Sequence, residues 1–297
     1  MAIRRSIVGI DSPDRLTDAL RDAQYLADDG LATAAYLALA LGKPLLLEGA
    51  PGVGKTEGAR ALASVLGRQV VRLQCYEGID AAHALYEWNY PRQLLGIRLA
   101  ESRGERLSDA DLFTEDYLLD RPLLAALRHP GPRPAVLLVD EVDRADDEFE
   151  AFLMELLAEH AVTIPELGTR KAEVPPVAVL TSNRTRDLHE ALKRRCLYHW
   201  IQHPGPERVA QIVRRRVPQA ADDLCRHVAE GVDRLRELSL RKPPGVAEAI
   251  SWAAALHALG ETELDADAAR RTISTVVKYD EDRAAVLEAG LDSVVPR

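Results

Sequence analysis

A glycine-rich segment that directly follows a short apolar run is the feature that most constrains the fold of this chain. It matches the pattern G-x-x-x-x-G-K-S/T and consists of Gly49, Ala50, Pro51, Gly52, Val53, Gly54, Lys55 and Thr56. Glycines permit backbone conformations in which successive N–H groups point at phosphate oxygens, while the lysine reaches the outer phosphates and the hydroxyl holds Mg²⁺. The apolar run at 45–47 predicts a strand before the segment, and the stretch 57–66 predicts a helix after it. We therefore expect a nucleoside triphosphate to bind here.

Short, almost uninterrupted apolar runs recur along the chain at residues 45–47, 70–73, 136–139 and 177–180, and we expect a fifth strand at residues 198–201. Their length and composition are typical of buried parallel strands. Residues 145–160 carry apolar side chains at the spacing of one helix face, so strand and helix alternate. This alternation predicts an α/β fold with a parallel sheet flanked by helices. We also expect a hairpin near 162–175, with strands at 162–164 and 173–174, and two helical pieces within 13–41 that Gly30 separates.

The segment Pro204-Gly205-Pro206 interrupts this alternation, and nearly every stretch beyond it has helical periodicity. We expect two domains, a nucleotide-binding core over 1–203 and a small all-α lid over 204–297. The chain has 47 acidic and 38 basic residues and a formal charge of -9, which argues against nucleic acid as a partner. No apolar run is long enough to span a bilayer, so we expect a cytoplasmic protein without a transmembrane segment.

Two adjacent carboxylates, Asp140 and Glu141, end the apolar run at 136–139. In an open α/β sheet the ligand lies at the carboxyl ends of the strands, which brings Asp140 within reach of the Mg²⁺ that Thr56 also holds. Glu141 is then suited to orient and deprotonate the water that attacks the γ-phosphate. The alternative is a solvated strand end whose acids cap the next helix.

Asn183 follows the run at 177–180 and lies beside the two acids if the two strands are neighbours. Its neutral amide can hold the attacking water, although Ser182 or Thr181 can do the same, and an asparagine that only shapes the turn is the alternative. The cationic segment Lys193-Arg194-Arg195 ends a helical stretch, where positive charge also suits the helix dipole.

The order of these motifs resembles the MoxR-type AAA+ ATPases over residues 14 to 280. The resemblance rests on the phosphate loop, Val-Asp-Glu-Val-Asp at 139–143, Thr-Ser-Asn at 181–183, Ala-Leu-Lys-Arg-Arg-Cys at 191–196 and the helical C-terminal part. Within that family the chain resembles the CoxD branch, through the stretches 73–78, 86–95, 164–169 and 241–248. The resemblance implies an AAA+ P-loop NTPase core with a helical lid and an insertion near 76–100.

The resemblance also implies roles for individual residues. Asn183 is the expected sensor 1, and Arg195, with Arg194 as second choice, is the expected finger that reaches the γ-phosphate of a neighbouring subunit. The lid helix begins Pro243-Pro244-Gly245-Val246 and has no arginine where sensor 2 usually stands, so Arg241 or Lys242 is the expected substitute. Such a finger implies a homo-oligomeric ring, usually a hexamer.

An ATP-hydrolysing chaperone that uses ATP and Mg²⁺ is the function that the resemblance implies. Its expected partners are a von Willebrand factor A domain protein and a client protein, with the CoxD branch pointing to maturation of a molybdenum enzyme resembling carbon monoxide dehydrogenase. The aromatic stretch 76–90 is expected either to grip the client or to pack at a subunit interface. The alternative function is an ATP-gated binding or assembly module with little turnover.

Overall fold

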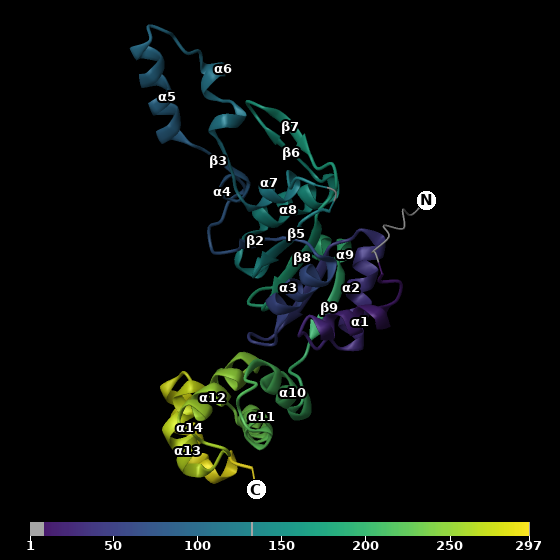
Figure 1. Ribbon diagram of the computed structural model, residues 1–297, viewed down its shortest axis with the longest axis vertical. Coiled ribbons are helices and arrows are strands. Elements are labelled where there is room, and N and C mark those ends of the chain that lie inside the picture. Colours follow the sequence, from purple (N-terminus) through teal and green to yellow (C-terminus); the bar gives the residue numbers. More distant parts are fainter. Residues whose placement is uncertain (1–8, 132, 297) are drawn as a thin grey trace. The chain divides into compact units, whose positions relative to one another are not determined.

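The computed structural model describes residues 9–131 and 133–296, and Figure 1 shows its helices and strands. The chain forms two compact units. The first contains the segment up to Ala23, Ala27–Glu48 and Thr56–His199, and the second contains Gln24–Leu26, Gly49–Lys55 and the residues from Trp200 onward. Residues 1–8 of the predicted core domain and residue 297 of the predicted lid lie outside the described residues. The proposed domain boundary at residue 204 stays a prediction.

A five-stranded sheet organises the first unit, with the strand order β2-β5-β8-β1-β9. Its strands are β1 (Leu45–Gly49), β2 (Val70–Gln74), β5 (Val136–Asp140), β8 (Val177–Ser182) and β9 (Leu197–Ile201). The pairs β2–β5, β5–β8 and β1–β8 are parallel. Every residue of β1 and β5 is buried, which explains why these strands are continuous apolar runs rather than alternating ones. The five predicted strands and the α/β fold class are confirmed.

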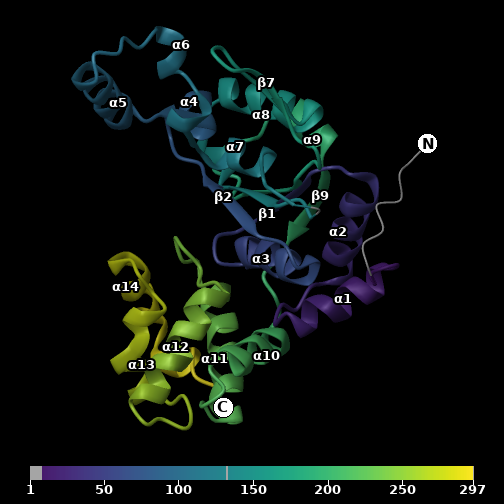
Figure 2. The same ribbon diagram turned by 45° about the horizontal axis from the view of Figure 1, so that its top comes forward.

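Helices flank this sheet (Figures 1 and 2). Those of the first unit are α1 (Pro13–Asp22), α2 (Asp29–Leu41), α3 (Lys55–Leu66), α4 (Ala81–Leu85), α5 (Tyr90–Ser102), α6 (Asp109–Leu112), α7 (Pro122–Leu127), α8 (Asp147–Glu159) and α9 (Glu190–Arg195), with 3-10 turns η1 (Glu115–Tyr117) and η2 (Val142–Arg144). Leu46, Leu137 and Leu180 from three adjacent strands are fully buried in the core between sheet and helices. This packing fixes the carboxyl ends of the central strands at one edge of the sheet.

The break between the first two helices was predicted wrongly at Gly30. It lies at residues 23–28, and Gly30 belongs to the first turn of α2. The reason is the cap of α2, since the side chain of Asp28 accepts a hydrogen bond from the backbone N–H of Leu31 at 2.7 Å.

Two small antiparallel pairs complete the first unit. The hairpin is formed by β6 (Ala161–Ile164) and β7 (Gly168–Lys171), so its second strand begins at Gly168 and the prediction of a strand at 173–174 was wrong. Residues 165–167 alone make the turn, which leaves no room for a longer loop around Gly168. The other pair consists of β3 (Tyr86–Trp88) and β4 (Leu118–Asp120). The helices α5 and α6 lie between these strands in the sequence, and Figure 1 shows them beyond β3.

The C-terminal part of the second unit is helical, as predicted. It contains α10 (Pro206–Arg216), α11 (Asp222–Glu237), α12 (Val246–Ala258), α13 (Ala266–Thr272), α14 (Asp280–Ala289) and 3-10 turns η3 (Ile273–Thr275) and η4 (Leu291–Ser293). Trp252 is fully buried at the centre of its core, and its indole N–H donates to the Thr272 hydroxyl at 2.7 Å. Among the described residues, none of the helices has the length and apolar character that a membrane crossing requires.

Candidate nucleotide site

The phosphate loop is held by its own backbone and by close packing within the second unit. Lys55 is 7% exposed, and its ammonium donates to the carbonyl oxygens of Gly49 and Ala50, both at 2.8 Å. Position 49 requires glycine, because a Cβ there would lie 2.4 Å from the carbonyl oxygen of Ile201. Gly52 has a φ of 78°, a left-handed conformation that favours glycine. Two positions of the loop therefore favour glycine for stated reasons, and the lysine ammonium is held against the loop carbonyl oxygens.

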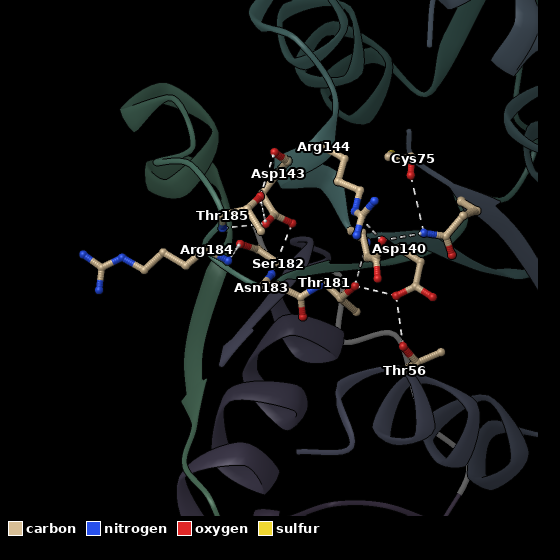
Figure 3. A network of polar contacts seen from close by, with 12 residues as sticks. Thr56, Cys75, Asp140, Asp143, Arg144, Thr181, Ser182, Asn183, Arg184 and Thr185 are labelled. Carbon is tan, nitrogen blue, oxygen red and sulfur yellow. Dashed lines mark hydrogen bonds and ion pairs between the residues drawn. The ribbon is translucent and has the colours of Figure 1, made fainter. Parts of the chain in front are cut away.

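The two predicted metal ligands come together in the first unit. Thr56 lies in the first turn of α3 and Asp140 ends β5, and the Thr56 hydroxyl donates to Oδ1 of Asp140 at 3.0 Å (Figure 3). Asp140 is 2% exposed. A hydroxyl and a carboxylate are the oxygen ligands that Mg²⁺ accepts, usually together with waters and phosphate oxygens. These two residues fit a magnesium site.

Arg72 of β2 also contacts Asp140, and the sequence reasoning missed it. Its Nε and Nη2 atoms donate to Oδ2 of Asp140 at 2.9 and 2.6 Å. The neighbouring Gln74 pairs in register with Asp140, and its side chain donates to Oε2 of Glu141 at 3.1 Å. Polar residues at alternate positions of an otherwise apolar strand were the available signal, because they share one face of the sheet.

Glu141 has an unusual backbone conformation directly after the strand. Its φ is 55°, in the left-handed region that residues other than glycine rarely adopt. Its backbone N–H donates to the Thr181 hydroxyl at 2.9 Å, and its carboxylate forms an ion pair with Nε of Arg144 at 2.7 Å. Strained conformations of this kind cluster at functional sites, where surrounding contacts hold them.

Asn183 lies beside the two acids because β5 and β8 are neighbours in the sheet. Its backbone N–H donates to Oδ1 of Asp143 at 3.1 Å, while its side-chain amide makes no hydrogen bond to any residue that the structure describes. The other two candidates for holding water are engaged. The Thr181 hydroxyl bonds Asp140 and Glu141, and the Ser182 hydroxyl donates to Glu48 at 3.0 Å and accepts from the Arg184 N–H. Of the three, Asn183 has the available side chain (Figure 3).

Three carboxylates gather at this edge of the sheet, and arginines pair with two of them, Arg72 with Asp140 and Arg144 with Glu141. Burial, followed by the charges of Asp140, Asp143 and Glu141, raises the pKa of the Cys75 thiol to about 12. Burial by itself would raise the pKa of Asp143, but hydrogen bonds from Thr185 and Asn183 outweigh it and lower that pKa below the usual value.

The two candidate finger residues end α9 and are exposed. Nη1 of Arg195 donates to the carbonyl oxygen of Met154 at 3.1 Å, and Arg194 forms an ion pair with Glu190 at 2.7 Å. Their expected role in a neighbouring subunit stays a prediction.

The candidate sensor 2 residue Arg241 lines a cavity of about 400 Å³ in the second unit, together with Ala50 and Pro51 of the phosphate loop. Its guanidinium lies 5.1 Å from the centre of the Tyr279 ring. Lys242 and Lys278 line the same cavity, so its charge is mainly positive. The sequence reasoning missed Lys278, which is distant along the chain.

A carboxylate stands near the first turn of the lid helix α12, where the family usually has an arginine. The Val246 N–H donates to the Gly52 carbonyl oxygen at 3.0 Å, and Glu248 accepts a hydrogen bond from the Gly245 N–H at 2.9 Å. A Cβ on Gly52 would lie 3.2 Å from Oε2 of Glu248, so this acid lies close to the phosphate loop.

The aromatic stretch 76–90 divides into packed and exposed side chains. The rings of Tyr86 and Trp88 contact edge to face at 6.0 Å, and Trp88 packs against Phe113 at 5.1 Å. Tyr76 and Tyr90 are exposed. Two of the four aromatic side chains are therefore packed within the chain, and the other two face solvent.

The parallel sheet, the phosphate loop and the helical C-terminal region define an AAA+ P-loop NTPase fold. Residues 44–196, just over half of the chain, match the AAA domain (dynein-related subfamily). The protein belongs to this family, which supports nucleotide binding.

Individual proteins show more partial likeness. The chain is 36% identical to the Lon protease of Halothermothrix orenii over 120 residues, which is 38% of this chain and 12% of that protein. It is 24% identical to replication factor C subunit 1 of Oryza sativa subsp. japonica over 194 residues, 64% of this chain and 16% of that protein. It thus spans less than a fifth of the length of these relatives. The Thermotoga maritima RuvB Holliday junction branch migration motor aligns at 15% identity over 97% of this chain and 87% of that one, with a TM-score of 0.45.

Proposed function

We propose that this protein binds ATP with Mg²⁺ and hydrolyses it to ADP and phosphate. The observation that carries the proposal is the chain of contacts from Thr56 through Asp140 to Glu141. The oxygens of the two proposed metal ligands, Thr56 and Asp140, share a hydrogen bond. The next residue, Glu141, has a left-handed backbone conformation. A turn that only joined strand to helix would require none of these contacts.

Each residue has a distinct task in the proposed reaction. Lys55 binds the outer phosphates, while the backbone N–H groups of the phosphate loop bind their oxygens. Thr56 and Asp140 hold Mg²⁺, which when bound neutralises the charge that develops on the phosphates. Glu141 accepts a proton from the attacking water, and the free amide of Asn183 orients that water.

We further propose that Arg195 completes the site of a neighbouring subunit in a homo-oligomeric ring, usually a hexamer. The resemblance to MoxR-type ATPases supports this role, as does the exposure of Arg195 at the end of α9. Arg194, whose guanidinium pairs with Glu190, is the second choice by the same resemblance. A finger of this kind contributes roughly 10³- to 10⁵-fold in rate.

The cationic cavity supports Arg241 as the residue of the lid part that senses the nucleotide, with Lys242 as the alternative. We place the domain boundary of the working protein near residue 204, between the nucleotide-binding core and this lid.

We propose a cytoplasmic chaperone that remodels a protein client. The resemblance to the CoxD branch points to a molybdenum enzyme similar to carbon monoxide dehydrogenase as client, and to a von Willebrand factor A domain protein as partner. The net charge of -9 argues against nucleic acid. The exposed Tyr76 and Tyr90 are candidates for contact with the client.

Phosphate release from ATP tests the hydrolysis. We compare wild type with Lys55→Ala and Glu141→Gln, and use Glu155→Gln on an exposed position of α8 as a matched control. Lys55→Ala should lose ATP binding, whereas Glu141→Gln should bind ATP and release no phosphate. Unchanged turnover in both variants would contradict the site. If wild type binds ATP without releasing phosphate, the chain is an ATP-gated binding module.

Mixing two inactive variants tests the shared site. Arg195→Ala subunits keep their own Glu141, and Glu141→Gln subunits can lend them Arg195. Activity that recovers on mixing supports the proposal, and no recovery at any ratio contradicts it. Arg194→Ala in place of Arg195→Ala tests the second choice, because recovery with Arg194→Ala and an active Arg195→Ala would assign the finger to Arg194.

A further inference from the structure

Two loops at the carboxyl edge of the sheet hold each other through buried hydrogen bonds. One comprises residues 140–144, the last residue of β5 with the loop after it, and the other comprises residues 181–185, the last two residues of β8 with the loop after them. Figure 3 labels Asp140, Asp143, Thr181, Asn183 and Thr185, which take part in these contacts. The two loops carry the acids and the asparagine of the proposed reaction.

From the β8 side, Thr181 bonds both acids. Its hydroxyl donates to Oδ1 of Asp140 at 2.5 Å and accepts from the backbone N–H of Glu141 at 2.9 Å. Thr181 is 1% exposed, so water does not compete for these bonds. The position of Glu141 therefore depends on the β8 strand.

From the β5 side, Asp143 bonds the loop that carries Asn183. Its Oδ1 accepts from the Asn183 N–H at 3.1 Å, and its Oδ2 accepts from the Thr185 N–H at 2.8 Å and the Thr185 hydroxyl at 2.7 Å. Asp143 is 2% exposed. Hydrogen bonds to an ionised carboxylate are among the stronger ones in proteins, so this acid fixes the backbone of Asn183.

We propose that Asp143 is a positioning residue of the hydrolytic site, which places the Asn183 amide relative to Glu141. The proposal rests on the proposed hydrolysis of ATP. The side-chain contacts of Asp143 are to Asn183 and Thr185 of the β8 segment. Asp143 acts through Asn183, whose main chain it binds and whose side chain it leaves available. Because Thr181 binds the acids in return, a shift in either loop moves the water-orienting amide and the base together.

The test is a double-mutant cycle between Asp143→Asn and Asn183→Ala. The amide that replaces the carboxylate keeps its size but loses charge and an acceptor, so the Asn183 main chain loosens. Misplacement of about 1 Å costs about 10²-fold in rate, and we expect kcat to fall about 10- to 100-fold with ATP affinity unchanged within about twofold. In a variant that already lacks the Asn183 amide, Asp143→Asn should lower kcat by less than about twofold more.

Asp146→Asn is the matched control, because Asp146 lies in the same region but caps only α8, through the Phe149 N–H at 2.8 Å. It should keep wild-type kcat. Effects of Asp143→Asn and Asn183→Ala that multiply would contradict the proposal, as would an Asp143→Asn variant with wild-type kcat or with equal losses in affinity and kcat.

Thr185→Val provides a milder second variant should Asp143→Asn fail to fold. It removes one donor to Asp143 and retains the N–H bond. We expect Thr185→Val to lower kcat severalfold, and to cause no further fall when Asn183 is also replaced by alanine. An unchanged kcat in Thr185→Val would contradict the proposal. If wild type and Asp146→Asn both release no phosphate, the proposed hydrolysis fails and this proposal fails with it. If both are active and the cycle is additive, only the positioning role fails.

Discussion

Replacing Thr181 by valine removes one hydroxyl and leaves a side chain of the same shape. The Glu141 N–H then loses its acceptor, and an unsatisfied buried donor costs about 1–3 kcal/mol. The Asp140 carboxylate loses one hydrogen bond, and a hydrogen bond to a charged group contributes about 1.5–3 kcal/mol. Thr56 and Arg72 still bind this carboxylate. Asp140 is 2% exposed, whereas Glu141 is half-buried, so water can partly replace the acceptor that the Glu141 N–H loses. Taking the lower part of both ranges, we expect the free energy of unfolding to fall by about 2.5–4 kcal/mol.

Urea denaturation followed by circular dichroism measures this change, and Thr181→Ser is the matched control. Serine keeps the hydroxyl and removes one methyl group, which should cost about 1 kcal/mol. A valine variant within about 0.5 kcal/mol of wild type would refute the reasoning, since surface substitutions alone change stability by that much. A serine variant less stable than the valine variant would refute it too, because the methyl contacts would then outweigh both hydrogen bonds.

Two further predictions concern the lid and the cysteines. Asp282 is buried and accepts hydrogen bonds from the backbone N–H groups of residues 241–242 at 2.7 and 3.1 Å. Asp282→Ala should therefore lower the free energy of unfolding by about 1–3 kcal/mol. Asp280→Ala, at an exposed position, is the control. Equal stability of the two variants would contradict this role. Burial raises the pKa of both Cys75 and Cys196 to about 12, so at pH 8 each stays a protonated thiol and should not react with a thiol reagent until urea unfolds the chain. Rapid labelling of either thiol in the native protein would contradict the burial.

The strands and the phosphate loop were predictable from local sequence. A parallel strand buried on both faces must be apolar along its whole length, as β1 and β5 are, and a glycine loop after such a strand has few other uses. The helix break was not predictable from Gly30, because the side chain of Asp28 decides where α2 begins.

The contacts of Arg72 and Asp143 could not be predicted from the sequence, for a different reason. Arg72 meets Asp140 only because β2 pairs with β5, and Asp143 meets the Asn183 backbone only because β8 is the next strand. A single sequence gives the residues that end each strand but not the order of the strands. Thus the reactive candidates were predicted individually, while the residues that hold them in place required the fold.

Single-turnover phosphate release, with ATP bound before Mg²⁺ is added, tests the central claim most directly. Wild type should release phosphate in one phase, and Glu141→Gln should bind ATP with a similar Kd but release phosphate at least about 10²-fold more slowly, the scale of general-base catalysis. Release by Glu141→Gln at the wild-type rate, with ATP fully bound in both proteins, would contradict hydrolysis at this site.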